Sequence, residues 1–320
     1  KAYDGTTSVA GSTFTATGVA GQTFTVTGAG DAANLASKNV QVGTVLSSLT
    51  GLSLGTSSNG GLSSNYNALS TAGSSYTVTA KGITLTGISA VDKIYDATTT
   101  AALNTASVGY SGLINGDAVA LSGSGTGSFA DKNAGANKAV TVSGYTLSGA
   151  DAGNYVVTQP TGLTASISKA SLVVSGIAAA NKTYDATTGA TLSGAASVTA
   201  LGGDSVSVAG TGTGSFADAN AASNKAVSVT GYTLTGADAG NYDVVQPNAV
   251  RATINKADVI VSGSKTYDGT TSVAGGTLTA TGVAGQTFTV TGAGDASNLS
   301  SKNVQSGAAL ASTTGLSLGS

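Results

Sequence analysis

The chain has 320 residues and a formal net charge of −2, and it contains no Cys, His, Met or Trp. All 15 acidic residues are Asp, and Arg251 is the single arginine. Without imidazole or thiol groups, a protein lacks the usual ligands of zinc and iron and the usual bases near neutral pH. The near-neutral net charge excludes an extensive basic surface for binding nucleic acid. No apolar run approaches the length of a membrane span.

The composition favours strands and tight turns over helices. Gly occurs 47 times and Pro twice, and Ala, Ser, Thr and Val fill most of the remainder. Thr and Val favour strands, whereas Gly, Asn, Asp and Ser favour turns. We therefore expect an all-β chain.

Internal repeats organise the sequence. A Lys-x-Tyr-Asp-(Gly/Ala)-Thr-Thr pattern occurs four times, with its Tyr-Asp pairs at Tyr3-Asp4, Tyr95-Asp96, Tyr184-Asp185 and Tyr267-Asp268. Residues 125–160 match residues 212–247 along their whole length, which defines subtype B. The first and last repeats share other segments at an offset of 264 residues and define subtype A. Such self-similarity is typical of tandem arrays.

The pattern predicts four repeats, at residues 1–81, 82–169, 170–256 and 257–320. Repeat 1 is expected to lack the apolar strand that opens the others, and repeat 4 is expected to stop before its last strands. We interpret the sequence as a window on a longer repetitive protein. Alternatively, a neighbouring chain supplies the absent strands by strand addition.

Repeat 2 shows the predicted elements in chain order. Strands are expected at residues 83–88, 108–114, 118–121, 139–147, 155–158 and 163–167, and Asn115-Gly116 is a hairpin signal. Short strands separated by turns at this spacing predict tandem immunoglobulin-like β-sandwiches. A parallel β-solenoid is the alternative, although a repeat shows no internal period of about 20 to 30 residues.

A D-x-G-x-Y motif precedes one strand in each middle repeat, with its ends at Asp151 and Tyr155 and at Asp238 and Tyr242. Immunoglobulin-like domains place a tyrosine near the start of a strand, where its hydroxyl bonds back to the backbone. We expect the same structural role here. Residues 64–66 are a degenerate copy of the motif in repeat 1.

Together with the Tyr-Asp turn, three further segments of the middle repeats carry a family resemblance. They are Gly-Ser-Phe-Ala-Asp, Gly-Tyr-Thr-Leu-(Ser/Thr)-Gly-Ala-Asp-Ala-Gly-Asn-Tyr and a closing Gln-Pro. The chain resembles the YDG-type repeats of large bacterial surface adhesins, which include filamentous haemagglutinin-like exoproteins. The resemblance implies export to a bacterial surface and a place in a long fibre, and it supplies no catalytic residues.

The sequence offers one metal hypothesis. Asp96, Asp185 and Asp268 could bind calcium together with backbone carbonyls, but calcium needs six to eight oxygen ligands. The simpler interpretation is a turn in which each Asp side chain caps its own backbone. No catalytic or cofactor-binding residue is predicted.

The functional prediction is a structural stalk or fibre segment of a secreted bacterial adhesin or biofilm matrix protein, and not an enzyme. One alternative is a self-assembling extracellular filament subunit completed by neighbouring chains, and another is a glycan-binding adhesive module. The expected partners are neighbouring repeats and, in a fibre, identical chains, with a host or abiotic surface contacted by other regions. No nucleic acid partner and no membrane-spanning role are expected for this segment.

Overall fold

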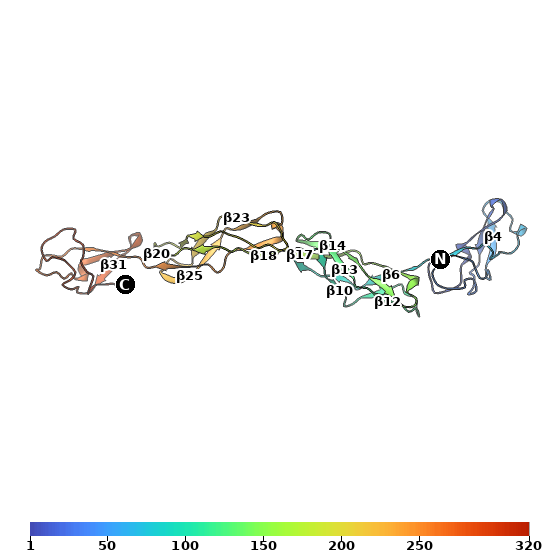
Figure 1. Ribbon diagram of the computed structural model, residues 1–320, viewed down its shortest axis with the longest axis horizontal. Coiled ribbons are helices and arrows are strands. Elements are labelled where there is room, and N and C mark those ends of the chain that lie inside the picture. The colour runs from blue at the N-terminus through green and yellow to red at the C-terminus, as the bar shows by residue number, and fades with distance from the viewer. Residues whose placement is uncertain (320) are drawn as a thin grey trace. The chain divides into compact units, whose positions relative to one another are not determined.

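A computed structural model describes residues 1–319, and these residues form strands, turns and short 3-10 segments without an α-helix. The chain divides into two compact units, residues 1–168 (unit 1) and 169–320 (unit 2). Figure 1 shows the strands of each unit in sequence colours. No helix among the described residues is long and apolar enough to span a membrane.

Repeat 2 is built on a five-stranded sheet. The order is β8 (Lys93–Ile94), β17 (Leu163–Ser168), β14 (Gly135–Ser143), β13 (Thr126–Phe129) and β9 (Thr100–Ala101). Side chains alternate across the sheet, so that Phe129, Val140 and Val142 are buried while their neighbours are exposed. This alternation is the signature of a sheet with one covered face.

Smaller sheets complete repeat 2. β6 (Lys81–Thr86) lies between β11 (Gly109–Ser111) and β16 (Tyr155–Thr158), and it pairs with β16 in parallel. Two antiparallel pairs join β7 (Ser89–Ala90) to β10 (Leu103–Asn104) and β12 (Ala120–Ser122) to β15 (Thr146–Ser148). The repeat therefore has the sheets of a β-sandwich with mixed strand directions.

Repeat 3 has the same plan. Its five-stranded sheet is β20 (Lys182–Thr183), β28 (Arg251–Asn255), β25 (Ala222–Thr230), β24 (Thr213–Phe216) and β21 (Gly189–Ala190). The smaller pairs are β18 (Ala170–Val173) with β27 (Tyr242–Val245), β19 (Ala178–Ala179) with β22 (Leu192–Ser193) and β23 (Ser207–Ala209) with β26 (Thr233–Thr235). Its core contains Phe216, Val227, Val229 and Ile254.

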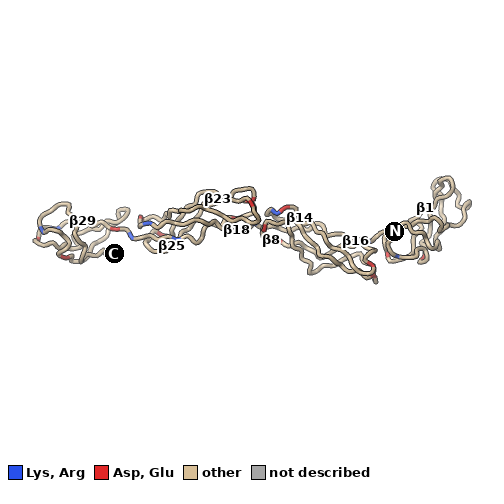
Figure 2. The backbone as a smooth tube through the Cα atoms, viewed as in Figure 1, with Lys and Arg blue, Asp and Glu red and all other residues tan. Residues whose placement is uncertain are grey.

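The subtype A repeats have fewer strands. Repeat 1 pairs β1 (Thr15–Thr17), β2 (Thr23–Thr27) and β4 (Ser53–Ser57), and separately β3 (Gln41–Thr44) with β5 (Tyr76–Val78). Repeat 4 orders β29 (Ile260–Gly263), β30 (Leu278–Thr281), β31 (Thr287–Thr291) and β32 (Ser317–Leu318) in one sheet. Figure 2 shows that charged residues are few along all these strands.

The prediction of all-β sandwich repeats is confirmed, and the solenoid alternative is not needed. Most strand boundaries shift from the predictions, as where β6 replaces the strand expected over residues 83–88 and β12 the one expected over residues 118–121, and glycines explain two of the larger differences. The strand expected over residues 108–114 is limited to β11, because Gly112 follows it with a φ of +100°. The strand expected over residues 139–147 is two strands, since Gly144 has a φ of +95° between β14 and β15.

Candidate interaction site at the repeat junction

The four Tyr-Asp turns share one hydrogen-bond pattern. In repeat 2, the Asp96 Oδ1 atom accepts hydrogen bonds from the Thr98 backbone N–H at 2.9 Å and from the Lys93 Nζ at 2.7 Å. Equivalent capping bonds close the turns at Asp4, Asp185 and Asp268. The Lys182 ammonium beside Asp185 lowers the pKa of that carboxyl to about 2. Each Asp thus stabilises its own turn.

The calcium hypothesis finds no supporting cluster among residues 1–319, where no three acidic side chains gather around one point. In each Tyr-Asp turn, a lysine ammonium already forms an ion pair with the Oδ1 atom of the Asp. A divalent cation would have to displace this ammonium and find further oxygen ligands.

The tyrosine of the first turn extends into the next repeat. Tyr3 is 1% exposed, and its hydroxyl donates a hydrogen bond to the Oδ2 atom of Asp117 in repeat 2 at 2.7 Å. The Tyr155 hydroxyl donates to the same oxygen, also at 2.7 Å. The two rings meet edge to face with their centroids 5.3 Å apart, an orientation that aromatic pairs favour.

Lys38 of repeat 1 completes the charge pairing. Its Nζ atom lies 2.9 Å from the Asp117 Oδ1 atom, and the Asp117 side chain is only 3% exposed. The ammonium also lies 5.8 Å from the centroid of the Tyr3 ring. Asp117 is therefore a nearly buried carboxylate that receives one cation and two hydroxyl donors.

An amide pair joins the same two repeats beside this carboxylate. The Asn154 side chain accepts a hydrogen bond from the Val40 backbone N–H at 2.9 Å and donates one to the Asn39 Oδ1 atom at 3.1 Å. We call these residues the junction cluster. Its members are Tyr3, Lys38, Asn39 and Val40 from repeat 1 and Asp117, Asn154 and Tyr155 from repeat 2.

The electrostatics of the cluster fix its protonation state near neutral pH. Hydrogen bonds from Lys38, Tyr155 and Tyr3 lower the pKa of Asp117 to about 2. Burial, reinforced by the bond to Asp117, raises the pKa of Tyr155 to about 12, and burial also raises the pKa of Tyr3. The carboxylate is charged and both hydroxyls remain donors.

An apolar core runs through the junction. Six side chains of repeat 1 and three of repeat 2 form one buried cluster, namely Tyr3, Val9, Leu35, Leu46, Tyr76 and Val78 with Ile83, Val119 and Tyr155. Val78 and Ile83 are both 0% exposed although they belong to different repeats. Repeats 1 and 2 therefore share a core across their boundary.

The D-x-G-x-Y motif has the predicted contact with the backbone. The Tyr155 hydroxyl accepts a hydrogen bond from the Ile114 N–H at 3.0 Å, and the Asp151 Oδ2 atom accepts one from the Ala118 N–H at 2.9 Å. Tyr242 and Asp238 make the equivalent bonds in repeat 3. Tyr66 in repeat 1 also follows a 3-10 turn and accepts a bond from the Val19 N–H.

Sequence reasoning missed most of the junction cluster. It identified Asn115-Gly116, which precede Asp117, as a hairpin signal, and it gave no role to Lys38, Asn39 or Asn154. Recurrence was the available signal, since Ser-Lys-Asn-Val-Gln occurs at residues 37–41 and again at residues 301–305. Asp117 likewise recurs as Asp204, where the Tyr242 hydroxyl donates to its Oδ2 atom at 2.7 Å.

Comparison with known proteins gives one family. The YDG domain model matches residues 79–162 and again residues 168–250, together more than half of the chain. No curated protein matches the chain, and no solved structure matches it. The matched segments contain Asp117 with Tyr155 and Asp204 with Tyr242, so the tyrosine-carboxylate pair belongs to the matched domains. The chain is a member of the YDG domain family.

Proposed function

We propose that this chain is a structural stalk or fibre segment of a secreted bacterial adhesin or biofilm matrix protein. Its task in this proposal is to hold neighbouring repeats in fixed orientation and so to provide reach and stiffness outside the cell. The resemblance of its motifs to adhesin repeats supports the extracellular bacterial location.

The junction cluster carries the proposal. A stalk needs connections that resist bending, and a flexible linker between domains does not provide them. In unit 1 a shared apolar core, an ion pair, the Tyr3 hydrogen bond and two hydrogen bonds of the Asn154 side chain link repeats 1 and 2. Bending at this junction would expose apolar surface and leave Asp117 without its partners, and both changes cost free energy.

The same geometry argues against a catalytic role for these side chains. Asp117 has its pKa lowered to about 2, so it is a weak base near neutral pH. Tyr155 has its pKa raised to about 12, so its hydroxyl is a poor nucleophile. The ionisable groups of the junction are engaged with one another.

A segment swap in the parent protein tests the stalk proposal. The chain is replaced by unrelated immunoglobulin-like repeats of equal length, surface display is confirmed, and attachment of the cells is measured. We expect attachment to persist, because a spacer contributes length and stiffness. A replacement by one short flexible linker is the matched control and should reduce attachment. Loss of attachment with the rigid replacement would contradict the proposal and indicate a specific contact on these repeats.

A further inference from the structure

All four repeats carry the same turn at the position of Asp117. Its sequence is an apolar residue, a variable residue, Gly and then Asp or Gln, at residues 19–22, 114–117, 201–204 and 283–286. In each copy the N–H of the Asp or Gln donates a hydrogen bond to the carbonyl of the apolar residue, at 2.9 to 3.2 Å. The last residue of the turn is Asp in both subtype B repeats and Gln in both subtype A repeats, so Asp117 corresponds to Gln286.

Within a repeat, the Gln takes the same tyrosine contact as the Asp. In repeat 1 the Tyr66 hydroxyl donates a hydrogen bond to the Gln22 Oε1 atom at 2.6 Å, as the Tyr155 hydroxyl does to Asp117 in repeat 2. Each of these hydroxyls also accepts a hydrogen bond from the N–H of the apolar residue that begins the turn. The two subtypes therefore build one arrangement with either a carboxylate or an amide at its centre.

The same position contacts the tyrosine of the Tyr-Asp turn in the preceding repeat. Tyr3 donates a hydrogen bond to Asp117 across the junction between repeats 1 and 2. Across the junction between repeats 3 and 4, the Gln286 Nε2 atom donates a hydrogen bond to the Tyr184 hydroxyl at 2.8 Å. Both junctions contain this contact, but only the first places a negative charge in it.

A second turn holds the residue that balances this charge. In residues 37–39 and 218–220 the side chain of the first residue accepts a hydrogen bond from the N–H of the third, at 3.1 and 2.8 Å. Lys38 and Ala219 are the middle residues of these two turns. Lys38 forms the ion pair with Asp117, whereas Ala219 is a half-buried neutral residue in the repeat that precedes Gln286.

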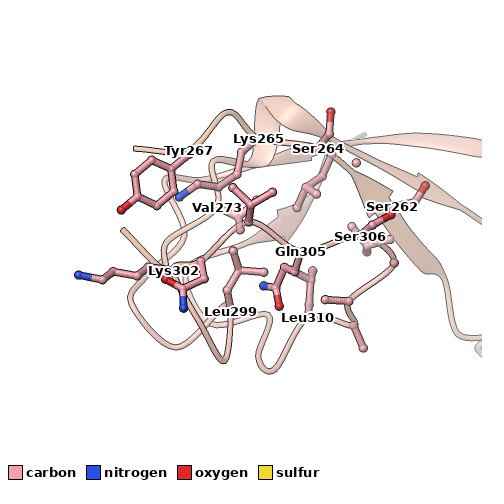
Figure 3. Close-up of a pocket in the computed structure, with 18 of the residues that line it drawn as sticks. Ser262, Ser264, Lys265, Tyr267, Val273, Leu299, Lys302, Gln305, Ser306 and Leu310 are labelled. Carbon is pink, nitrogen blue, oxygen red and sulfur yellow. The ribbon is translucent and has the colours of Figure 1, made fainter. Parts of the chain in front are cut away.

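The middle residue lies on the side of its repeat that carries the tyrosine of the Tyr-Asp turn. The Lys38 Nζ atom is 5.8 Å from the centroid of the Tyr3 ring. In repeat 4, Lys302 is the middle residue of the equivalent turn, and Figure 3 shows Lys302 and Tyr267 at the same side of the pocket that both residues line. The fold of each repeat thus places this residue beside the side chain that contacts the tyrosine.

The two positions vary together along the sequence. The middle residues of repeats 1, 2 and 3 are Lys38, Lys132 and Ala219, and the repeats that follow them carry Asp117, Asp204 and Gln286. A nearly buried carboxylate needs a cation, whereas an amide needs only hydrogen-bond partners. A lysine beside the amide would lose hydration without gaining an ion pair.

We propose that the residue at the position of Lys38 selects the subtype of the repeat that follows it. Lysine fits a subtype B repeat, which presents Asp, and alanine fits a subtype A repeat, which presents Gln. The partner in each case is the next repeat of the same chain. The inference concerns how repeats are matched, and it does not require that the segment acts as a stalk.

Recoding the junction between repeats 3 and 4 in the 320-residue chain tests the proposal. Gln286→Asp places a carboxylate where the preceding repeat offers no cation. We expect backbone hydrogen exchange in β20 and β31, which flank Tyr184 and Gln286 in sequence, to quicken by about tenfold. Adding Ala219→Lys to this variant should restore most of the lost protection, because the ion pair of the first junction is then rebuilt. Ala219→Met adds a straight side chain without charge and is the matched control, which should restore little.

The comparison of the two double variants decides the outcome. Equal restoration by lysine and methionine would overturn the proposal, since the size of the side chain would then explain the effect, and so would the absence of restoration by lysine. If Gln286→Asp unfolds repeat 4, the reciprocal exchange at the first junction decides instead. Lys38→Ala should quicken exchange in β12, which follows Asp117, and adding Asp117→Gln should reverse that change. A double variant that exchanges as fast as Lys38→Ala alone would overturn the proposal.

Discussion

A single carboxylate organises the boundary between repeats 1 and 2. Asp117 follows Asn115-Gly116 in a loop, and the loop carries its side chain to Tyr3, Tyr155 and Lys38. The geometry leaves Asp117 only 3% exposed, so its charge must be balanced by these partners. The junction therefore depends on one acidic side chain more than on any other polar group that it contains.

Replacing Asp117 by Asn should destabilise unit 1. The substitution keeps the shape but removes the charge that pairs with Lys38 and accepts from Tyr3, so we expect a loss of about 2 kcal/mol in the free energy of unfolding. Asp131→Asn removes an exposed ion pair with Lys138 and should cost much less, because solvent screens that pair. Urea unfolding, monitored by hydrogen exchange in peptides from unit 1, measures the loss of unfolding free energy in both variants. Equal losses would show that the junction carboxylate has no special role.

The pH dependence of the unfolding free energy should reflect the titration of the Asp117 carboxyl. The pKa of Asp117 is about 2 in the folded chain, and that of an unfolded Asp is about 3.9. As the pH falls, Asp117 therefore takes up a proton in the unfolded chain before it does so in the folded chain. The stabilisation that the charged Asp117 gives the folded chain is present above about pH 4 and is lost as the pH falls towards 2. The difference in urea midpoint between the native chain and Asp117→Asn should shrink over that interval. A difference independent of pH would exclude this linkage.

At the scale of strands and turns, the family motifs connect neighbouring elements. The side chain of Gln159 accepts a bond from the Tyr145 N–H and donates one to the Tyr145 carbonyl, which ties the end of β16 to the start of β15. Gln246 and Tyr232 make the same pair in repeat 3. The ring of Tyr145 lies against Gly125, where a Cβ atom would overlap it. The motif residues therefore serve contacts between strands.

Two glycines of repeat 2 should respond differently to alanine. Gly125→Ala places a methyl group in the ring of Tyr145 and should cost about 1 to 3 kcal/mol of unfolding free energy. Gly153→Ala introduces its methyl group into open space without a left-handed φ, so it should change stability by less than about 0.5 kcal/mol. Thermal or urea unfolding of the two variants compares them. A larger effect at Gly153 would mean that this motif glycine has a role that its surroundings do not explain.

At the scale of a whole unit, the shared core makes repeats 1 and 2 a cooperative pair. β5 of repeat 1 and β6 of repeat 2 bury Val78 and Ile83 in the same cluster. Cooperative opening follows contiguous packing more closely than it follows sequence boundaries. Unit 1 should therefore open across the repeat boundary.

A core substitution in repeat 1 should lower hydrogen-exchange protection in repeat 2 as well. Val78→Ala deletes two buried methyl groups and should cost about 2 kcal/mol, and we expect it to reduce hydrogen-exchange protection in β16 of repeat 2 as well as in β3 of repeat 1. Val42→Ala, at an 84% exposed position, is the control and should leave exchange unchanged. A loss of protection confined to repeat 1 would indicate that the two repeats open independently.

The sequence by itself determined the all-β class, the repeats and the local turn chemistry. Strand propensity, glycine placement and an Asp two residues before a backbone N–H act over a few residues, so Asp96 and Tyr155 could be assigned from their neighbours. The family segments could be found because they recur.

Only the tertiary structure decided what the junction is made of. Lys38 and Asp117 lie 79 residues apart in sequence, and no local pattern pairs them. Asp117 is a turn residue by every local rule, and it becomes the centre of the junction because packing of the shared core brings Tyr3 and Lys38 against it. Contacts between repeats depend on how completed sheets pack together, and that information is distributed over the whole of unit 1.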